Sequence, residues 1–253
     1  MSLNFKKFGE GEPLIILHGL MGMLDNWQTQ AKALSENFEV YLIDQRNHGK
    51  SFHSDEHNYS VLAEDLFGFI YENQLHDVNL LGHSMGGKVV MKFAQNNPHL
   101  VNKLIVADIA PRHYPVHHQH LLDVLLSINL NGIKRRQEVS ELMERNIENK
   151  VIVLFLLKNL YWIERGKLAW RFNLKAIKRN ISLVSDEIKD KPYDGETLFV
   201  GGSNSSYISE PDHVDIKKYF PNSRINMINK AGHWLHADQP KEFLRICTEF
   251  LID

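Results

Sequence analysis

The first half of the chain alternates short apolar runs with longer stretches that have a helical pattern of apolar positions. The apolar runs are LIIL at 14–17, VYLI at 40–43, VNLL at 78–81 and LIVA at 104–107. Strands of a parallel sheet are covered on both faces, so they appear as continuous apolar runs rather than as alternating ones. The pattern therefore predicts an α/β protein whose sheet is parallel at least in its middle.

The pattern changes between residues 111 and 192. The segments there look helical, contain no clear strand, and carry many histidine, basic and aromatic residues. Strand and helix patterns alternate again from residue 193 onward. We predict a core domain of residues 1–110 and 193–253, with a helical cap at 111–192 over the carboxyl ends of the strands, where ligands bind in open α/β folds.

One serine lies among glycines in the sequence GHSMG at 82–86, where an apolar strand gives way to a helix. This context gives the GxSxG pattern its meaning, because a sharp turn there exposes the serine and requires glycine two residues away on either side. We predict Ser84 as a nucleophile. The Met85 amide, at the start of the helix, is free to bind an anion. The alternative is a tight turn with an incidental serine.

A second turn, LHGLMG at 17–22, follows the first apolar run. A close turn can direct the Leu20 amide into the same space as that of Met85, and two such donors would form an oxyanion hole. We interpret His18 as a hydrogen-bonding residue rather than a base. We expect it to border the substrate pocket with Met21 and Trp234.

Aromatic residues of the predicted cap either line an acyl pocket or form the cap's own core, and the sequence does not separate these roles. The residues concerned are Tyr161, Trp162, Trp170 and Phe172. Core is the usual place for most such residues. We assign Trp162 to the pocket.

The base that activates the serine must come from among 14 histidines. His233 follows the last predicted strand in a glycine-containing loop, and the histidine comes last in chain order in enzymes with this serine turn. His236, in the same loop, ranks second because no glycine precedes it.

The acid that orients the histidine is less evident. The loop after TLFV at 197–200 reads GGSNSSYISEP and has no aspartate where one is usual. Asp108 ends the preceding strand, 24 residues after the serine. It can hold the histidine tautomer and stabilise the imidazolium. The alternative is that Asp108 only caps a turn, with the acid role passing to Glu210, Asp212 or Asp238.

Composition narrows the classes of partner. The chain has 29 Lys and Arg against 31 Asp and Glu, a net charge of -2, so a nucleic-acid partner is not expected. The single cysteine, Cys247, allows no intrachain disulfide, and the longest aliphatic run, at 151–157, is too short to span a bilayer. With no signal peptide in view, we expect a cytoplasmic monomer or homodimer.

A histidine cluster raises the question of a metal. Its members are His113, His117, His118 and His120. No carboxylate or cysteine completes the set with a familiar spacing, so we predict no metal. We also predict no cofactor, because acyl transfer by an activated serine needs none. A separate charged segment, IDQRNHGKS at 43–51, is interpreted as a loop held by the charge pair of Asp44 and Arg46 beside Gly49.

With these residues placed, the chain resembles the α/β-hydrolases, and more specifically the YbfF-type serine esterases related to the eukaryotic α/β-hydrolase-domain proteins. The segments that carry the resemblance run almost from end to end: LHGLMG, IDQRNHGKS, GHSMGGK, VADIAP, WRFNL, FVGGSNSSYIS and AGHWLHA. VADIAP together with the aspartate-free GGSNS loop is the more specific combination.

The resemblance implies an α/β-hydrolase fold with a helical cap inserted after the sixth strand. It also implies a triad of Ser84, Asp108 and His233, with Leu20 and Met85 as oxyanion donors. The implied substrates are esters of short to medium acyl chains, with acyl-CoA thioesters as a further class.

Other reactions are possible on this framework. A haloalkane dehalogenase would need an aspartate at position 84, so the serine argues against it. A carbon-carbon bond hydrolase or a proton-abstracting lyase can use the same triad. A non-catalytic ligand-binding protein is the alternative from another class, but it would not need Ser84, His233 and two oxyanion turns together.

Overall fold

The computed structural model describes residues 2–116 and 118–253, and a seven-stranded sheet forms its centre. The strand order is β1-β3-β2-β4-β5-β8-β9. The strands are β1 (Phe5–Phe8), β2 (Glu12–Leu17), β3 (Phe38–Ile43), β4 (Val78–His83), β5 (Val101–Ala107), β8 (Thr197–Gly202) and β9 (Ser223–Ile228). β1 pairs antiparallel with β3, and the other neighbouring pairs of the described sheet are parallel. The predicted α/β class with a mostly parallel sheet is confirmed.

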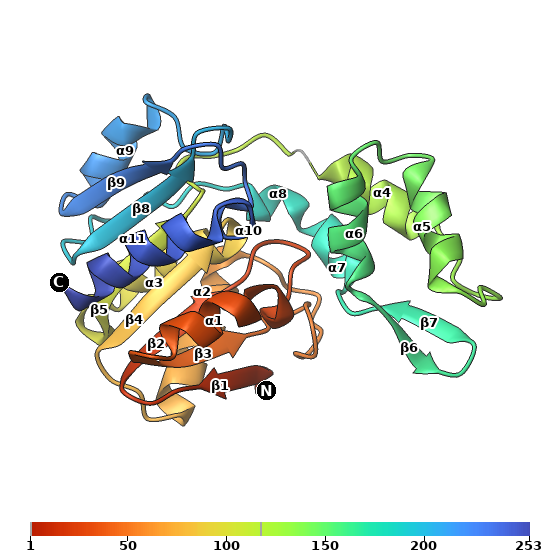
Figure 1. Cartoon of the computed structure of the whole chain (residues 1–253), viewed down its shortest axis with the longest axis horizontal. Helices are drawn as coiled ribbons and strands as arrows, with labels where there is room; N and C mark the ends of the chain where they lie inside the picture. The colour runs from red at the N-terminus through yellow and green to blue at the C-terminus, as the bar shows by residue number, and fades with distance from the viewer. Residues whose placement is uncertain (1, 117) are drawn as a thin grey trace.

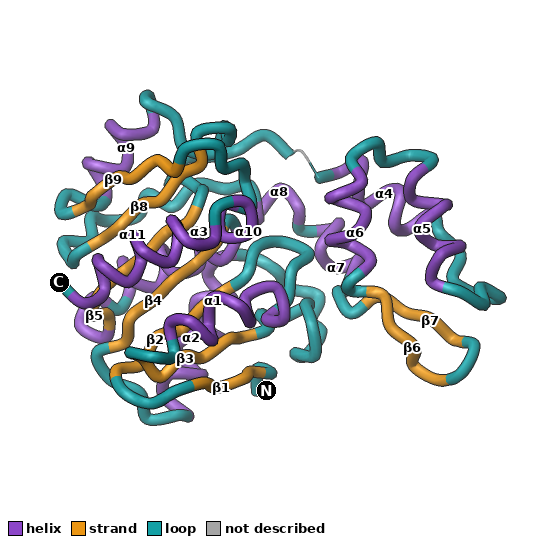
Figure 2. Tube along the Cα trace, in the orientation of Figure 1, coloured by secondary structure: helices purple, strands orange, loops and turns teal. Residues whose placement is uncertain are grey.

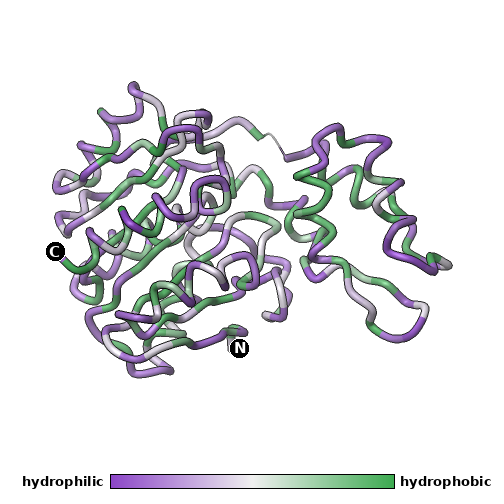
Figure 3. Tube along the Cα trace, viewed as in Figure 1, coloured by the Kyte–Doolittle hydropathy of each residue, from purple (hydrophilic) through white to green (hydrophobic). Residues whose placement is uncertain are grey.

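Helices cover both faces of this sheet (Figures 1 and 2). α2 (Tyr59–Glu72) and α3 (Met85–Asn96) pack on one face, whereas α1 (Gln28–Leu34) and α11 (Pro240–Ile252) pack on the other. β2 shows why its sequence is apolar without alternation: Ile15 and Leu17 join the first core, and Leu14 and Ile16 join the second. In Figure 3, which colours the chain by hydropathy, the strands in the middle of the sheet appear mainly as hydrophobic segments.

The shorter helices of the core are η1 (Leu24–Trp27), η2 (Pro98–Leu100), α9 (Asp212–Tyr219) and α10 (Leu235–Asp238). η1 and α10 lie near the carboxyl ends of the strands, in the loops after β2 and β9. Within the two described ranges, no helix has both the length and the apolarity needed to cross a bilayer.

The segment between β5 and β8, which we call the insertion, forms a lobe beside the sheet (Figure 1). Its elements are α4 (Gln119–Ser127), α5 (Arg136–Glu144), α6 (Lys150–Leu157), β6 (Leu160–Glu164), β7 (Lys167–Trp170), α7 (Leu174–Arg179) and α8 (Ile181–Val184). The lobe has its own apolar core, in which Phe172 is buried, and Trp170 stacks on Phe172 at its border.

The insertion differs from the sequence prediction in two ways. It follows β5, the fifth strand along this chain, rather than the sixth. It also contains an antiparallel hairpin, β6–β7, where no strand was predicted. The aromatic and β-branched residues at 161–163 favour a strand, and Gly166, at φ +84°, allows the tight turn that joins it to the next.

Candidate active site

Ser84 stands on a sharp turn between β4 and α3. Its backbone has φ 52° and ψ −117°, a conformation that is strained for a residue with a side chain. A Cβ atom on Gly82 would lie 2.2 Å from the Gly86 carbonyl oxygen, and one on Gly86 would lie 2.4 Å from that of Leu17. The two glycines are therefore what allows the chain to make this turn so close to β2.

The structure brings Ser84 together with His233 and Asp108. The Ser84 hydroxyl lies 3.1 Å from Nε2 of His233, and Nδ1 of the same ring lies 2.7 Å from Oδ2 of Asp108. The aspartate is fully buried, whereas the histidine side chain is 23% exposed. With Nδ1–H donating to the carboxylate, Nε2 is left free to accept the serine proton.

The loop after β8 holds the Asp108 carboxylate. The Gly202 amide donates to Oδ1 at 3.0 Å, and the Ser205 hydroxyl donates to Oδ2. This loop, which lacks an aspartate, therefore supplies the donors for a carboxylate on the neighbouring strand. Asp108 itself has φ 51°, so this candidate acid, like Ser84, lies on strained backbone at a strand end.

The fallback acids have other contacts. Asp212 pairs with Arg112, with 2.6 Å between Oδ1 and Nε, and Asp238 accepts the Gly232 amide at 2.8 Å. Among the described hydrogen bonds, the carboxylate that contacts His233 is that of Asp108.

Two neighbours besides Asp108 fix the position of His233. Nε2–H of His83 donates to the His233 carbonyl oxygen at 2.8 Å. The Tyr207 ring stacks on the imidazole, with centroids 4.0 Å apart and planes at 22°. Sequence reasoning missed Tyr207, whose only signal is an aromatic residue in the GGSNSSY loop.

His236 is placed as a core residue instead. Its ring stacks on Trp27 with centroids 4.0 Å apart, and it is 4% exposed. Burial lowers its pKa to about 3, so the ring is neutral near pH 7.

The turn that carries Leu20 lies against the serine. A Cβ on Gly19 would come within 3.3 Å of the Ser84 Cβ, so the missing side chain lets the two turns approach. Leu20 and Ser84 border the same cavity. Met85 begins α3, and the first N–H groups of a helix have no acceptor within it. The backbone thus supplies candidate donors on both sides of the serine.

His18 and His48 support this turn from behind. His18 Nδ1–H donates to the Gly19 carbonyl at 2.8 Å, and its Nε2 accepts the Gln45 amide at 3.1 Å. His48 Nε2 accepts the Met21 amide at 3.0 Å, while its Nδ1–H donates to the Arg46 carbonyl. Each ring uses one nitrogen as a donor and the other as an acceptor, which only the neutral form can do.

Burial keeps both rings neutral. It lowers the pKa of His18 to about 4 and that of His48 to about 3. The same segment contains Asp44, which accepts the Leu24 amide at 2.8 Å and the Lys50 amide at 2.9 Å, and Arg46, which pairs with Asp65. The loop-fixing role proposed for this segment agrees with these contacts.

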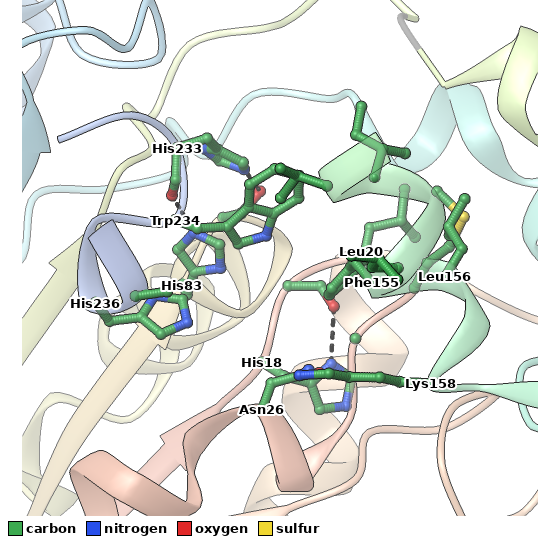
Figure 4. A pocket seen from close by; sticks show the side chains of 18 of the residues that line it. His18, Leu20, Asn26, His83, Phe155, Leu156, Lys158, His233, Trp234 and His236 are labelled. Atoms are coloured by element: carbon green, nitrogen blue, oxygen red, sulfur yellow. Dashed lines mark hydrogen bonds between the residues drawn. The ribbon is translucent and has the colours of Figure 1, made fainter. Parts of the chain in front are cut away.

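A cavity of about 580 Å³ opens beside Ser84 and His233 (Figure 4). His18, Met21 and Trp234 line it. Trp162, which was expected there, lies on β6 with 39% of its surface exposed and does not border this cavity. Its place is taken by α6, which sequence reasoning did not connect with the site.

The wall that α6 provides is apolar. Its residues at the cavity are Val151, Ile152, Leu154, Phe155 and Leu156. The Phe155 ring packs near Trp234, with centroids 5.4 Å apart, so the insertion and the His233 loop meet across the cavity. Lys158, just after α6, adds a basic group at its border.

The histidine cluster of the sequence is dispersed. Within residues 2–116 and 118–253, no three His, Cys, Asp or Glu side chains are placed to hold a metal ion. His113 lies 3.7 Å from a carboxylate oxygen of Asp186, and His120 donates to the Asn146 carbonyl. His117 lies outside the described residues.

Comparisons with known proteins agree with this architecture. Residues 12–136 match the family described as alpha/beta hydrolase fold. A putative esterase/lipase of Haemophilus influenzae is 38% identical over 94% of this chain and 82% of its own. Esterase YbfF of Escherichia coli is 32% identical over 95% of this chain and 93% of its own.

Among solved structures, one described as a marine microorganism esterase superposes with a TM-score of 0.96. It is 45% identical and covers 98% of this chain and 99% of its own. The predicted resemblance to YbfF-type esterases is confirmed by these relatives, which match nearly the whole chain. The chain therefore belongs to the α/β-hydrolase family.

Proposed function

We propose that this protein is a serine esterase that hydrolyses carboxylic esters of short to medium acyl chains. The observation that carries the proposal is the unbroken line of contacts from the Ser84 hydroxyl through His233 to the buried Asp108, at the edge of an apolar cavity. The names of the esterase and lipase relatives support the same class of reaction.

In the proposed first step, the Ser84 oxygen attacks the ester carbonyl carbon while Nε2 of His233 takes its proton. The resulting imidazolium is stabilised by Asp108 through the 2.7 Å contact at Nδ1. Collapse of the tetrahedral intermediate breaks the bond to the alcohol oxygen, which receives the proton from His233. An acyl-enzyme ester on Ser84 is left.

Water completes the cycle in the second step. His233 takes a proton from the water as its oxygen attacks the acyl carbon, and then returns a proton to the serine oxygen as the acid leaves. In both steps the carbonyl oxygen becomes negative. The backbone amides of Leu20 and Met85 are the proposed donors to it, and such donors contribute roughly 10²–10³ in rate each.

The lining of the cavity supports an acyl substrate. Its α6 wall is aliphatic and aromatic, and its volume of about 580 Å³ falls within the range of small-molecule sites. Thioesters have the same carbonyl chemistry, and Lys158 adds a positive charge beside the cavity. We therefore include acyl-CoA thioesters as a second substrate class.

We further propose that residues 111–192 act as a cap. The buried apolar residues between Leu122 and Ile181 form the core of the lobe, whereas Val184 and Ile188 pack with the main core. The part of the insertion that packs as a separate lobe therefore ends near α8, about ten residues before the boundary at 192.

The test is hydrolysis of p-nitrophenyl esters from acetate to palmitate, together with thiol release from acyl-CoA. Wild type is compared with Ser84→Ala, and Ser140→Ala on α5 serves as a matched control outside the site. We expect Ser84→Ala alone to abolish turnover and labelling by a fluorophosphonate. Labelling of Ser84 without turnover of any ester would keep the nucleophile and reject the substrate class. Absence of both would favour a ligand-binding protein.

A further inference from the structure

Lys88 is a buried lysine on α3, one helical turn after Ser84. Its backbone amide donates to the Ser84 carbonyl at 3.1 Å, so the two residues share the first turn of the helix. The residue is 1% exposed, although an ammonium group is costly to bury without partners. Ser84 and Lys88 also border a second, small cavity of about 40 Å³.

The partners of the Lys88 amine come from both crossings between the core and the insertion. Nζ donates to the carbonyl oxygen of Arg112 at 3.0 Å, on the outgoing stretch after β5. It donates to those of Ser185, at 3.3 Å, and Asp186, on the returning stretch after α8. Figure 1 shows these two stretches as the connections between the sheet and the lobe.

The two crossings also bind each other at this point. The Tyr114 amide donates to the Ser185 carbonyl at 2.9 Å, and the Ile188 amide donates to that of Pro111 at 2.7 Å. The Tyr59 hydroxyl, from α2, donates to the Val184 carbonyl. The crossings therefore form one paired hinge, and Lys88 contacts it from the helix that carries the nucleophile.

We propose that Lys88 is a positioning residue that fixes the insertion, and with it the α6 wall of the cavity, relative to Ser84. An ammonium group has three N–H donors, and here three carbonyl oxygens lie within reach of them. A rigid helix thereby sets the hinge from which α6 reaches across the site. The mechanism proposed above uses Ser84, His233 and Asp108 and gives Lys88 no chemical role.

The charge of this amine is sensitive to pH. Burial lowers the pKa of Lys88 to about 7, and the charged groups that face it are Asp186, Glu187, Arg112 and Lys189, with the rings of Tyr59 and Tyr114 beside it. A neutral amine has only two N–H groups, so it leaves one of the three carbonyls without a donor. The hinge should therefore loosen as the pH rises through about 7.

Lys103 provides a matched control. It is also buried, at 9% exposure, and its amine donates to the carbonyls of Phe250 at 3.0 Å and Leu251 at 3.3 Å. These acceptors lie on α11, away from the insertion. Lys88→Met and Lys103→Met therefore remove the same chemistry, but only the first releases the hinge.

Two readouts test the proposal. The first is hydrogen exchange of the backbone at 111–116 and 184–188, at pH 6 and pH 8.5, which needs no substrate. The second readout, which rests on the proposed esterase function, is the KM and kcat for p-nitrophenyl octanoate. The rate at which a fluorophosphonate labels Ser84 is measured beside them.

We expect Lys88→Met to speed exchange at both crossings and to raise KM for the octanoate roughly 3- to 30-fold, with labelling changed less than about 2-fold. At pH 8.5, the backbone amides at both crossings of the wild-type protein should exchange faster than the base-catalysed increase in the exchange rate alone predicts. Lys88→Met should not show this additional increase between pH 6 and pH 8.5. Lys103→Met should leave the crossings and KM as in wild type. If Lys88→Met fails to fold, Lys88→Gln, which keeps two N–H donors, takes its place.

Equal behaviour of the Lys88 and Lys103 variants in both readouts would overturn the proposal. Failure of both Lys88 variants to fold while Lys103→Met folds would also overturn it, because Lys88 would then be needed for the core rather than for the cap. Inactivity of wild type on every ester would instead reject the proposed function. The exchange data would still decide the role of Lys88.

Discussion

Replacing Asp108 with asparagine should remove turnover while keeping the fold. The side chain keeps its shape, and the Gly202 amide, which donates to Oδ1, requires an oxygen at that position. The amide NH₂ of asparagine must then occupy the place of Oδ2, facing Nδ1 of His233. An NH₂ group can only donate, so Nδ1 loses its proton and Nε2 carries it instead.

That tautomer places a hydrogen between His233 and the serine. The ring can then no longer accept the Ser84 proton across the 3.1 Å contact. In other triads the corresponding change costs about 10⁴ in kcat. At about 1.4 kcal/mol for each factor of ten, this raises the activation barrier by about 5.5 kcal/mol. The Ser205 hydroxyl can rotate to accept from the new NH₂, so the loop after β8 should keep its place.

The assay is kcat on p-nitrophenyl butyrate, normalised to protein whose folding is checked by thermal unfolding. Asp44→Asn is the control, because Asp44 is also buried and also accepts several donors, yet it does not contact His233. We expect the control to lose stability and to keep turnover within about 10-fold. An Asp108→Asn variant with turnover within about 10-fold of wild type would refute the assigned tautomer and move the acid role elsewhere.

Three further changes test other parts of the structure. Gly86→Val should lower the free energy of unfolding by more than about 3 kcal/mol, because the valine Cβ would lie 2.4 Å from the Leu17 carbonyl oxygen. A normal soluble yield and a normal melting temperature would contradict this prediction. Among the histidines that the structure describes, five have pKa values that burial lowers below 6.5. The unfolded chain therefore binds more protons than the folded one as the pH falls below 6.5. Each of these histidines should then lower the free energy of unfolding by up to about 1.4 kcal/mol per pH unit. A melting temperature that stays level from pH 6.5 to 5 would exclude this loss of stability. The five residues are His18, His48, His57, His83 and His236. Phe155→Ala should move the preferred ester of a p-nitrophenyl series to longer acyl chains, since the ring fills space beside Trp234, and an unchanged optimum would place the acyl chain elsewhere.

The fold could be predicted wherever burial alone dictates the sequence. β2 to β5 are covered on both faces and therefore appear as uninterrupted apolar runs. β1 reads FKKF and is mostly exposed at the sheet edge, so its sequence carries no such run. The β6–β7 hairpin could not be predicted because its strands have only five and four residues and meet at the polar turn formed by Glu164, Arg165, Gly166 and Lys167.

The site could be predicted where one backbone turn requires particular residues. The glycines around Ser84 and the loop of His233 mark such turns, and Asp108 follows from the adjacency of two parallel strands. Tyr207 and His48 act through contacts between distant segments, which local sequence does not reveal. The aliphatic run at 151–157 shows in the sequence only that it is too short to span a bilayer, because its place in the wall of the Ser84 cavity depends on how the insertion packs.

Ser84 and Asp108 follow neighbouring strands, and the residues before them, His83 and Ala107, are paired in the sheet. The proposed nucleophile and its proposed acid thus share one rigid frame, and the loop after β8 binds the Asp108 carboxylate through Gly202 and Ser205. Exchange of this loop for one of another length or composition is consequently compatible with catalysis if those two donors and the ring of Tyr207 are kept. Within this loop, the exposed positions Asn204 and Ser206 are the ones open to change, because Ile208 is buried in the core and the Ser203 hydroxyl oxygen accepts the Lys230 amide.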